Sequence, residues 1–531
     1  MKFLLVGINS KFIHSNLAVH SLKNYVDENS DFGSCIEIKE YTINQRKEEI
    51  LASIFKENPD YIGFSCYIWN WSMVRELLVE IPKLLPETEV FLGGPEVSYD
   101  DNVIFENFPG VSAVIVGEGE KTILELVEKY CIPENREPLS SIKGLKLPSG
   151  MTGYREVMSM DEVPFSYEKE LFEHKIVYYE SSRGCPFRCG YCLSSIDKDM
   201  RFRSLENVFK HLDIFLNSKV PQVKFIDRTF NSNHNHSTKI WQYIQEHDNG
   251  VTNFHFEIAA DIMTDEEIDI ISRMRPGLVQ LEIGVQSTNE KTLREINRYV
   301  NTSHIKEVTS KLLKPHNAHV HLDLIAGLPF EDYESFKKSF DEVFNMNPHQ
   351  LQLGFLKVLK GTVIESKIDE YEIKFLDTPP YEVLSTKWIS YGDIIKLKKI
   401  EEVLEIYYNS AQFTNTLPVL MKEFESPFAF FDALACYFDE NDYFVKTPAR
   451  SRRYDILLEF SKKLYLWTNE EKNGEECSDE RIEEIRDLLT LDYYLREKPK
   501  SKPDFVRRIP DLEFDYEHRD PITYNALILT K

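Results

Sequence analysis

The sequence has no long apolar run and little cysteine. No stretch approaches the roughly 18 consecutive apolar residues that a membrane-spanning helix needs. The apolar run that begins at Phe3 is broken by Gly7 and Asn9, which makes it too short for the hydrophobic region of a signal peptide. Eight cysteines in 531 residues are too few for a disulfide framework. We therefore expect a cytoplasmic protein, in a reducing compartment, that makes no use of a membrane.

Basic residues are also in short supply. Lys and Arg number 63 against 88 Asp and Glu, which leaves a net charge of −25. Such an acidic balance argues against a chain-wide surface for nucleic acid or anionic lipid. Two local basic runs with aromatic residues, 446–454 and 496–508, keep an RNA partner open as an alternative. A steep salt dependence of RNA binding would favour it.

The composition is that of a globular protein, with 42% hydrophobic and 12% aromatic residues. At roughly 100–200 residues per domain, the length suggests about three domains. Residues 1–130 alternate apolar strands with amphipathic helices, which predicts a Rossmann-like, doubly wound parallel sheet in an α/β fold. Ligands bind such sheets at the carboxyl ends of the strands. Residues 131–175 are richer in Pro and Gly and read as a linker with a small hairpin.

A second β/α alternation occupies residues 176–365. Its six strands are fewer than the eight that close a full barrel, so we expect a partial (β/α)6, TIM-barrel-like domain. After residue 365 the strand patterns stop, and apolar residues recur at spacings of three and four, which predicts a mainly helical region over 366–531. The expected strands of the second alternation are 175–184, 222–227, 253–260, 278–285, 319–329 and 351–359.

Three cysteines cluster in the stretch "SSRGCPFRCGYCLSS", directly after the first strand of this second region. Three thiolates can hold three irons of a [4Fe–4S] cluster and leave the fourth iron open to a small ligand. Gly184, Pro186 and Gly190 suit a backbone that wraps tightly around a cluster. A zinc site is the alternative, but no fourth Cys or His lies nearby at finger-like spacing. The expected cluster ligands are Cys185, Cys189 and Cys192.

The stretch "CPFRCGYC" resembles the CxxxCxxC loop of the radical S-adenosylmethionine (SAM) superfamily. The resemblance implies that SAM binds the open iron through its amino and carboxylate groups and is cleaved reductively to a 5′-deoxyadenosyl radical. It also implies an electron donor such as flavodoxin or ferredoxin. "FIDRTFN" departs from the family's commoner Gly-Gly-Glu form. By resemblance, the residues expected to contact SAM are Tyr191, Asp227, Arg228, Thr229, Glu257, Gln286, Ser287, Ile325 and Gly327.

Two Gly-rich strand ends, "FLGGPEVS" and "IVGEGEKT", mark the N-terminal region, but neither contains the G-x-G-x-x-G dinucleotide fingerprint. Together with "GFSCYIWN" they resemble the cobalamin-binding domain that precedes many radical SAM enzymes. The alternative is a flavodoxin-like domain that binds no ligand. The cobalamin contacts that the resemblance implies are Ser65, Tyr67, Trp69, Asn70, Gly93, Gly94, Pro95, Glu96, Gly117, Glu118 and Gly119.

The Asp-x-His-x-x-Gly motif that supplies a histidine to cobalt in some cobalamin proteins is missing from this region. We therefore expect cobalt without a protein histidine ligand. His14 and His20 are the histidines nearby, and a lone His is more often structural than a ligand. Tyr67 and Trp69 are candidates to cover the lower face of the ring, with core aromatics as the alternative.

The resemblance implies a radical enzyme that methylates an unactivated carbon through methylcobalamin, with a second SAM to remethylate cob(I)alamin. Rearrangement, cyclisation or oxidation without methyl transfer, RNA modification, and a non-catalytic cobalamin sensor are the alternatives. The helical region resembles an extension of one subgroup and implies no substrate, so the partner is an unidentified small molecule or peptide. We expect the cysteine loop and the Gly-rich turns to face each other across the substrate, with specificity set by residues beyond 365. The sequence identifies no catalytic side chain.

Overall fold

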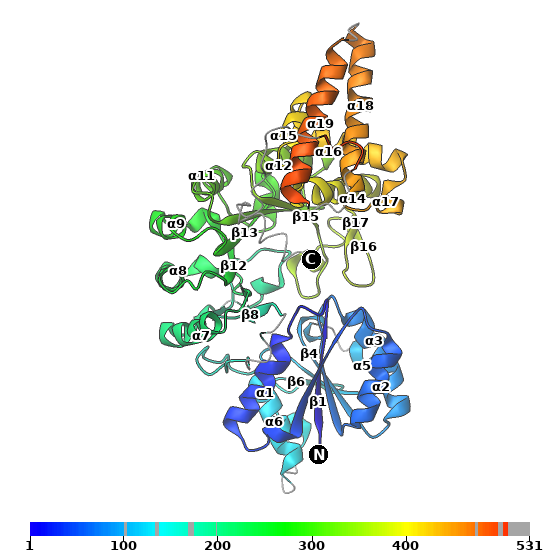
Figure 1. The fold of residues 1–531 in the computed structure, drawn as a ribbon. Coiled ribbons are helices and arrows are strands. Elements are labelled where there is room, and N and C mark those ends of the chain that lie inside the picture. Colours follow the sequence, from blue (N-terminus) through cyan, green and yellow to red (C-terminus); the bar gives the residue numbers. More distant parts are fainter. Residues whose placement is uncertain are drawn as a thin grey trace. The chain divides into compact units, whose positions relative to one another are not determined.

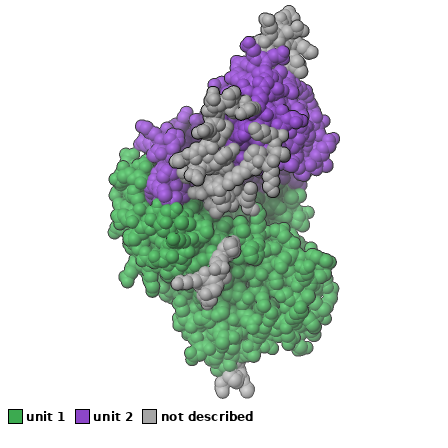
Figure 2. Space-filling view, viewed as in Figure 1, with its two compact units in different colours: residues 1–273, 357–383 green, residues 274–356, 384–531 purple. Residues whose placement is uncertain are grey.

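The computed structural model describes residues 1–99, 103–132, 137–167, 172, 175–197, 199–472, 476–497 and 503–507. These residues form two compact units, shown in Figure 2. Unit 1 contains residues 1–273 and 357–383, and unit 2 contains residues 274–356 and 384–531. No helix in the described part of the chain is both long and apolar enough to cross a bilayer.

Unit 1 begins with a parallel sheet in the order β2-β1-β3-β4-β5 (Figure 1). All seven residues of β1 are buried, as expected for a strand covered on both faces. Helices α1 and α6 pack on one face, and α2 and α3 pack on the other. This is the doubly wound sheet that the sequence predicts. Its elements are β1 (Phe3–Asn9), α1 (Leu17–Asn29), β2 (Ile36–Thr42), α2 (Lys47–Glu57), β3 (Tyr61–Ser65), α3 (Trp71–Leu84), β4 (Glu89–Gly93), α4 (Pro95–Ser98), α5 (Val103–Asn107), β5 (Val111–Ile115) and α6 (Glu120–Cys131).

A hairpin extends this sheet beyond β5. Strand β6 (Leu145–Leu147) pairs antiparallel with β5, and β7 (Gly150–Met151) pairs antiparallel with β6. The hairpin lies in the stretch that reads as a linker in the sequence. Part of that stretch is therefore built into the N-terminal sheet.

The rest of unit 1 starts the second β/α region. Strands β8, β11 and β12 pair in parallel in that order, each followed by a helix. Two short strands, β9 and β10, lie between β8 and the first helix, and residues 357–383 return to this unit. The elements are β8 (Val177–Tyr179), β9 (Ser182–Arg183), β10 (Arg201–Phe202), α7 (Leu205–Asn217), β11 (Gln222–Phe225), α8 (His234–Glu246), β12 (Asn253–Ile258), α9 (Asp265–Ser272), α13 (Val363–Ser366) and β16 (Lys374–Phe375).

Unit 2 continues the alternation with the parallel strands β13, β14 and β15. Burial alternates along β13, which is typical of a strand with one face in the core and the other toward a barrel interior. The six parallel strands of the predicted partial barrel are thus present, three in each unit. The elements are β13 (Val279–Gln286), α10 (Glu290–Glu295), α11 (Thr302–Leu313), β14 (His319–Ala326), α12 (Tyr333–Phe344) and β15 (Gln350–Phe355).

The carboxyl-terminal part of unit 2 is helical, as predicted. An aromatic cluster supports it, in which the ring of Phe413 lies 5.0 Å from that of Tyr407 and 4.7 Å from that of Tyr454. The elements are α14 (Tyr391–Leu404), a π-helix (Glu405–Asn409), α15 (Leu417–Leu420), α16 (Pro427–Glu440), α17 (Tyr443–Lys446), α18 (Arg452–Lys472) and α19 (Glu476–Arg496).

The expectation that strands stop after residue 365 is wrong in one detail. Strand β16 forms a two-stranded sheet with β17 (Val383–Ser385). Strands of two and three residues are too short to show the alternation by which a strand is identified in a sequence.

Candidate active site

The three cysteines lie in a loop whose base is closed by a two-stranded ribbon. Strands β9 and β10 pair antiparallel, with Arg183 opposite Arg201, and residues 184–200 connect them. Gly184 begins the loop with a φ of +94°, and a Cβ built there would lie 2.6 Å from the carbonyl oxygen of Asp199. Glycine is required where the two ends of the loop approach so closely.

The three thiols of this loop lie close enough to interact. Cys189 is buried, whereas Cys185 and Cys192 are partly exposed. Burial raises the pKa of the Cys185 thiol, and the neighbouring thiols of Cys192 and Cys189 also raise it. Iron replaces the protons of such thiols, because metal ligands must be deprotonated. Three thiols on one loop fit a cluster with one open iron.

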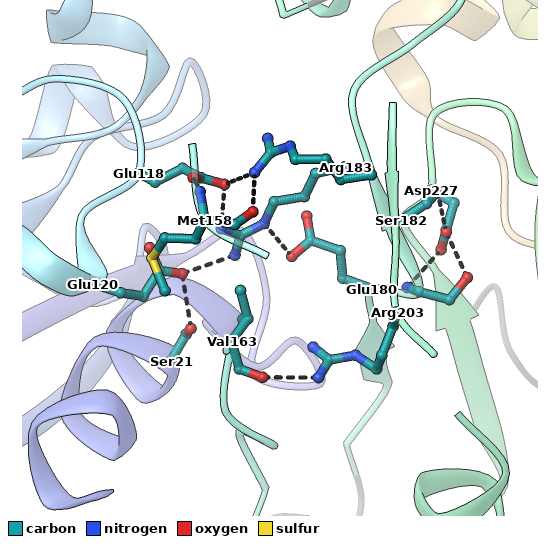
Figure 3. Close-up of polar contacts among 12 residues, drawn as sticks. Ser21, Glu118, Glu120, Met158, Val163, Glu180, Ser182, Arg183, Arg203 and Asp227 are labelled. Carbon is teal, nitrogen blue, oxygen red and sulfur yellow. Dashed lines mark hydrogen bonds and ion pairs between the residues drawn. The ribbon is translucent and has the colours of Figure 1, made fainter. Parts of the chain in front are cut away.

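Asp227, one of the predicted SAM contacts, is fully buried behind the ribbon (Figure 3). Its carboxylate accepts hydrogen bonds from the Ser181 N–H at 3.2 Å, the Ser181 hydroxyl at 2.7 Å and the Ser182 hydroxyl at 2.5 Å. Burial raises the pKa of this carboxyl to about 6, against the opposing effect of these hydrogen bonds. Asp227 therefore ties the end of β11 to β9.

The raised pKa of Asp227 predicts a pH dependence of stability. Because the folded-state pKa lies above the ordinary Asp value of 3.8, the protonated form favours folding. This contribution is complete below about pH 4 and is lost as the pH rises through about 6. A rise from 3.8 to about 6 corresponds to about 3 kcal/mol.

We expect the parent to lose free energy of unfolding relative to Asp227→Asn between about pH 4 and pH 6.5, measured by urea denaturation of the apoprotein. Asp161→Asn is the control. Burial alone would raise the pKa of Asp161, but the hydrogen bonds from Asn207 and Ser204 lower it overall. Its removal should therefore produce no trend in this range. Equal pH slopes for the parent and Asp227→Asn would contradict the prediction.

The two residues after Asp227 differ from it in exposure. Arg228 is exposed. Burial raises the pKa of Tyr67, and the charge of Arg228 opposes part of that rise. The Thr229 hydroxyl lies 3.6 Å from the sulfur of Cys185. Arg228 thus presents the accessible charge of this strand end, and Thr229 lies against the cysteine loop.

The other predicted SAM contacts are divided between the two units. In unit 1, Tyr191 is partly buried in the turn before Cys192, and Glu257 is partly buried on β12. In unit 2, Gln286 ends β13 with a φ of +73°, and Ile325 lies on β14, which Gly327 follows with a φ of +89°.

Ser287, in unit 2, is fully buried and has a structural partner. Its hydroxyl donates to a carboxylate oxygen of Glu331 at 2.6 Å and accepts from the Asn289 N–H at 3.0 Å. Burial raises the pKa of Glu331 to about 7, although the hydrogen bonds from Ser287 and Ser339 lower it. The Ser287 hydroxyl therefore supports the turn after β13.

Four predicted cobalamin contacts lie at the end of β3 and in the turn that follows it: Ser65 ends the strand, and Tyr67, Trp69 and Asn70 belong to the turn. The side-chain amide of Asn70 donates to the carbonyls of Ile8 and Ser65 at 3.0 and 2.8 Å, and Asn70 is fully buried. The rings of Tyr67 and Trp69 stack with centroids 4.3 Å apart, and Trp69 is 45% exposed. Asn70 thus shapes the turn, while the stacked aromatic pair offers a flat surface at the carboxyl edge of the sheet.

The four predicted glycines differ in what surrounds them. Gly94 has a φ of +110°, and a Cβ there would lie 2.5 Å from the carbonyl oxygen of Cys66. A Cβ on Gly117, where φ is +80°, would meet nothing within 4 Å among the described atoms. Gly119 faces Leu22, and Gly93 has ordinary contact with Ile115. Gly94 is required by close backbone packing, whereas Gly117 borders open space that suits a ligand.

Pro95 and Glu96 follow Gly93 and Gly94 and begin the short helix α4. Glu96 is buried and accepts a hydrogen bond from the hydroxyl of Tyr381, in the returning segment of unit 1.

Glu118 is engaged by protein groups. Its carboxylate accepts from Arg183 at 2.8 Å, from Arg201 at 2.7 Å and from the N–H of Met158 at 2.8 Å. Burial raises the pKa of Glu118, but the charge of Arg183 and these hydrogen bonds outweigh it, so the pKa is lowered overall. Glu118 therefore contacts the cysteine ribbon in this structure.

Both histidines near the cobalamin-binding turns have partners. His14 Nδ1 lies 2.6 Å from the hydroxyl oxygen of Tyr178, and His20 Nε2 lies 3.3 Å from a carboxylate oxygen of Glu40.

Sequence reasoning missed Arg183, Arg201 and the segment 357–383 as parts of this region. The signal that could have identified Arg183 is its position in the sequence: a charged residue directly before Gly184, the glycine that opens the loop. The contact of residues 357–383 with the cysteine loop had no such signal, because it joins residues far apart in the chain. There the Ile364 N–H donates to the Gly190 carbonyl at 2.9 Å.

The basic run 446–454 is largely paired within unit 2. Arg450 lies 2.8 Å from Glu497, Arg452 lies 2.8 Å from Glu459, and Lys446 lies 3.6 Å from Asp442. In the second basic run, residues 498–502 and 508 lie outside the described residues.

Three families match successive parts of the chain. The B12 binding domain matches residues 4–127, the Radical SAM superfamily matches residues 179–343, and the family described as "Protein of unknown function (DUF4080)" matches residues 369–528.

Curated relatives match at low identity. An uncharacterized methyltransferase of Pyrococcus horikoshii is 26% identical over 70% of this chain and 79% of the relative. The cobalamin-dependent radical SAM methyltransferase TokK of Streptomyces tokunonensis is 20% identical over 70% of this chain and 58% of the relative. An anaerobic magnesium-protoporphyrin IX monomethyl ester cyclase of Cereibacter sphaeroides is 20% identical over 57% of this chain and 52% of the relative.

Two solved structures share the fold. The methyltransferase TsrM from Kitasatospora setae, with cobalamin and a [4Fe–4S] cluster bound, has a TM-score of 0.58 at 16% identity and covers 72% of this chain and 79% of its own. OxsB, with aqua-cobalamin and SAM bound, has a TM-score of 0.60 at 16% identity and covers 92% of this chain and 78% of its own. The B12 and radical SAM matches contain the Gly-rich turns and the cysteine loop, respectively. The chain thus combines a B12 binding domain, a radical SAM domain and a carboxyl-terminal DUF4080 region, and the first two domains imply cobalamin, SAM and a [4Fe–4S] cluster as its cofactors.

Proposed function

We propose that this enzyme transfers a methyl group from cobalamin to an unactivated carbon of its substrate. The observation that carries the proposal is the direct contact between the cysteine ribbon and the second Gly-rich turn, through Arg183 and Glu118 in unit 1. A carbon radical and a methyl donor must approach to about 3–3.5 Å, so the loops that hold them need to adjoin. The methyltransferases among the relatives support the same reaction.

In this proposal Cys185, Cys189 and Cys192 hold the cluster. Bound together, the cluster and SAM supply a 5′-deoxyadenosyl radical, and cobalamin supplies the methyl group. Arg228 is suited to an anionic group of a bound cofactor, because it is exposed and directly precedes Thr229, whose hydroxyl lies against Cys185. The open space at Gly117 and the exposed ring of Trp69 are suited to the corrin.

We further propose that residues beyond 365 help to form the substrate pocket. The support is the segment 357–383, which contacts the cysteine loop through Ile364 and the first Gly-rich turn through Tyr381 and Glu96. A chain that ends at about residue 365 would lose Tyr381, a buried side chain of unit 1. Its loss of activity would therefore say little about specificity, and substitutions in 366–383 are the better test.

The reaction is tested with anaerobically reconstituted enzyme, a flavodoxin or ferredoxin reductant, and a panel of deuterium-labelled metabolites. Transfer of label into 5′-deoxyadenosine identifies the substrate. We expect the product to gain one CH₂, because a methyl group replaces hydrogen. A labelled 5′-deoxyadenosine with a product that gains no CH₂ would favour cyclisation, rearrangement or oxidation and contradict methyl transfer. A reaction without reductant is the control.

A further inference from the structure

The guanidinium of Arg183 is held by three carboxylates at once (Figure 3). Its Nε donates to Glu180, its Nη1 to Glu118 and its Nη2 to Glu120, each at 2.8 Å. Glu118 lies in the Gly-rich turn between β5 and α6, Glu120 is the first residue of α6, and Glu180 directly follows β8. One side chain at the base of the cysteine loop is thus joined to a cobalamin-domain turn more than 60 residues earlier in the chain.

Arg201 reaches the same turn from the other strand of the ribbon. It lies opposite Arg183 in the β9–β10 pairing, and its Nη1 donates to Glu118 Oε1 at 2.7 Å, the same oxygen that accepts from Arg183. It also donates to the Met158 carbonyl at 2.9 Å. The two arginines therefore lie at the two ends of the cysteine loop. Both donate to the same carboxylate oxygen, Oε1 of Glu118 in the Gly-rich turn.

The two arginines of this ion-pair network and their Glu partners are largely buried, and the carboxylates outnumber the guanidiniums. Arg183 and Arg201 are 16% and 13% exposed, and Glu120 is 5% exposed. Four carboxylates face the two guanidiniums, because Asp197 also lies 3.1 Å from Arg201. The Ser21 hydroxyl and the Met158 N–H supply further donors to Glu120 and Glu118. Buried ion pairs whose hydrogen bonds are satisfied favour one arrangement of the segments that carry them. Removal of either partner leaves the other charge buried without a compensating group.

We propose that Glu118, Arg183 and Arg201 form a clamp that positions the cysteine loop on the Gly-rich turn 117–119. All three are positioning residues, which act through the loops that carry the cofactor sites. The inference goes beyond the proposed function, since a fixed placement of the two loops is needed whether or not a methyl group is transferred. It also assigns Glu118 a role other than the cobalamin contact that the sequence predicts.

The clamp is tested on holoenzyme with Glu118→Gln, Arg183→Gln and Arg183→Lys. Pulsed electron paramagnetic resonance measures the distance distribution between cob(II)alamin and the reduced cluster, and iron, sulfide and cobalamin contents are measured separately. Arg155→Gln is the matched control, because Arg155 makes a two-fold ion pair with Glu125 on α6, at 2.8 and 2.6 Å, without contact to the ribbon.

We expect Glu118→Gln and Arg183→Gln to retain all three cofactor components and to broaden or shift the distance distribution, while Arg155→Gln matches the parent. Arg183→Lys should behave like Arg183→Gln, because an ammonium cannot reproduce the fixed fork that reaches three carboxylates. An unchanged distribution in both Gln variants would overturn the clamp. Loss of cobalamin alone from Glu118→Gln would overturn it as well and favour direct binding. If Arg183→Gln does not fold, Glu118→Gln alone decides between these outcomes.

Discussion

Replacing Cys185, Cys189 and Cys192 together by alanine is expected to abolish the iron–sulfur cluster and SAM cleavage. The three thiols are carried by one loop, and those of Cys192 and Cys189 help burial to raise the pKa of Cys185, which indicates that they lie close together. Without thiolate ligands no iron can be retained, and without the cluster no electron can reach SAM. The measurements are iron and sulfide content, visible absorbance and 5′-deoxyadenosine formation under anaerobic conditions.

Cys436→Ala is the control for the cysteine variant. Cys436 is exposed on α16, and the cluster assignment gives it no part. It should leave iron content and SAM cleavage unchanged. A full complement of iron and sulfide in the triple variant would refute the assignment.

Two glycine substitutions in the N-terminal domain are expected to separate folding from cofactor binding. Gly94→Val should destabilise the domain and lower cobalamin occupancy together, because its Cβ would overlap the Cys66 carbonyl and the positive φ costs about 1–3 kcal/mol. From the sequence alone, a side chain at Gly94 is expected to block the corrin and lower cobalamin occupancy without unfolding the barrel. The overlap with Cys66 adds a loss of stability in the N-terminal domain itself.

Gly117→Asn should lower cobalamin occupancy with little change in stability. Asn tolerates the left-handed conformation better than most residues, and its side chain would enter the open space at this turn. Occupancy is measured by absorbance after reconstitution, and stability by thermal unfolding of the apoprotein. Cob(II)alamin bound to the parent should show no nitrogen coupling from a protein imidazole. Unchanged occupancy in Gly117→Asn, or such a coupling, would contradict this assignment of the site.

Much of the fold could be predicted because it depends on local patterns. The strands of the N-terminal sheet and the six barrel strands are apolar runs between helical periodicities, and the six barrel strands lie within a few residues of their predicted positions. The short β16 and β17 escaped prediction because two or three residues carry no period. The cysteine loop was also visible, since the spacing of its three cysteines is itself the signal.

The sequence by itself determined the α/β architecture, the cofactor loops and their order along the chain. Only the tertiary structure decided what several side chains at those loops do. Asp227 is enclosed by Ser181 and Ser182, and Glu118 is bound by Arg183 and Arg201. The physical reason is that burial and ion pairing depend on partners brought together from distant parts of the chain. Spacing in one segment reveals the residues that a loop offers, but not which of them the fold has already paired.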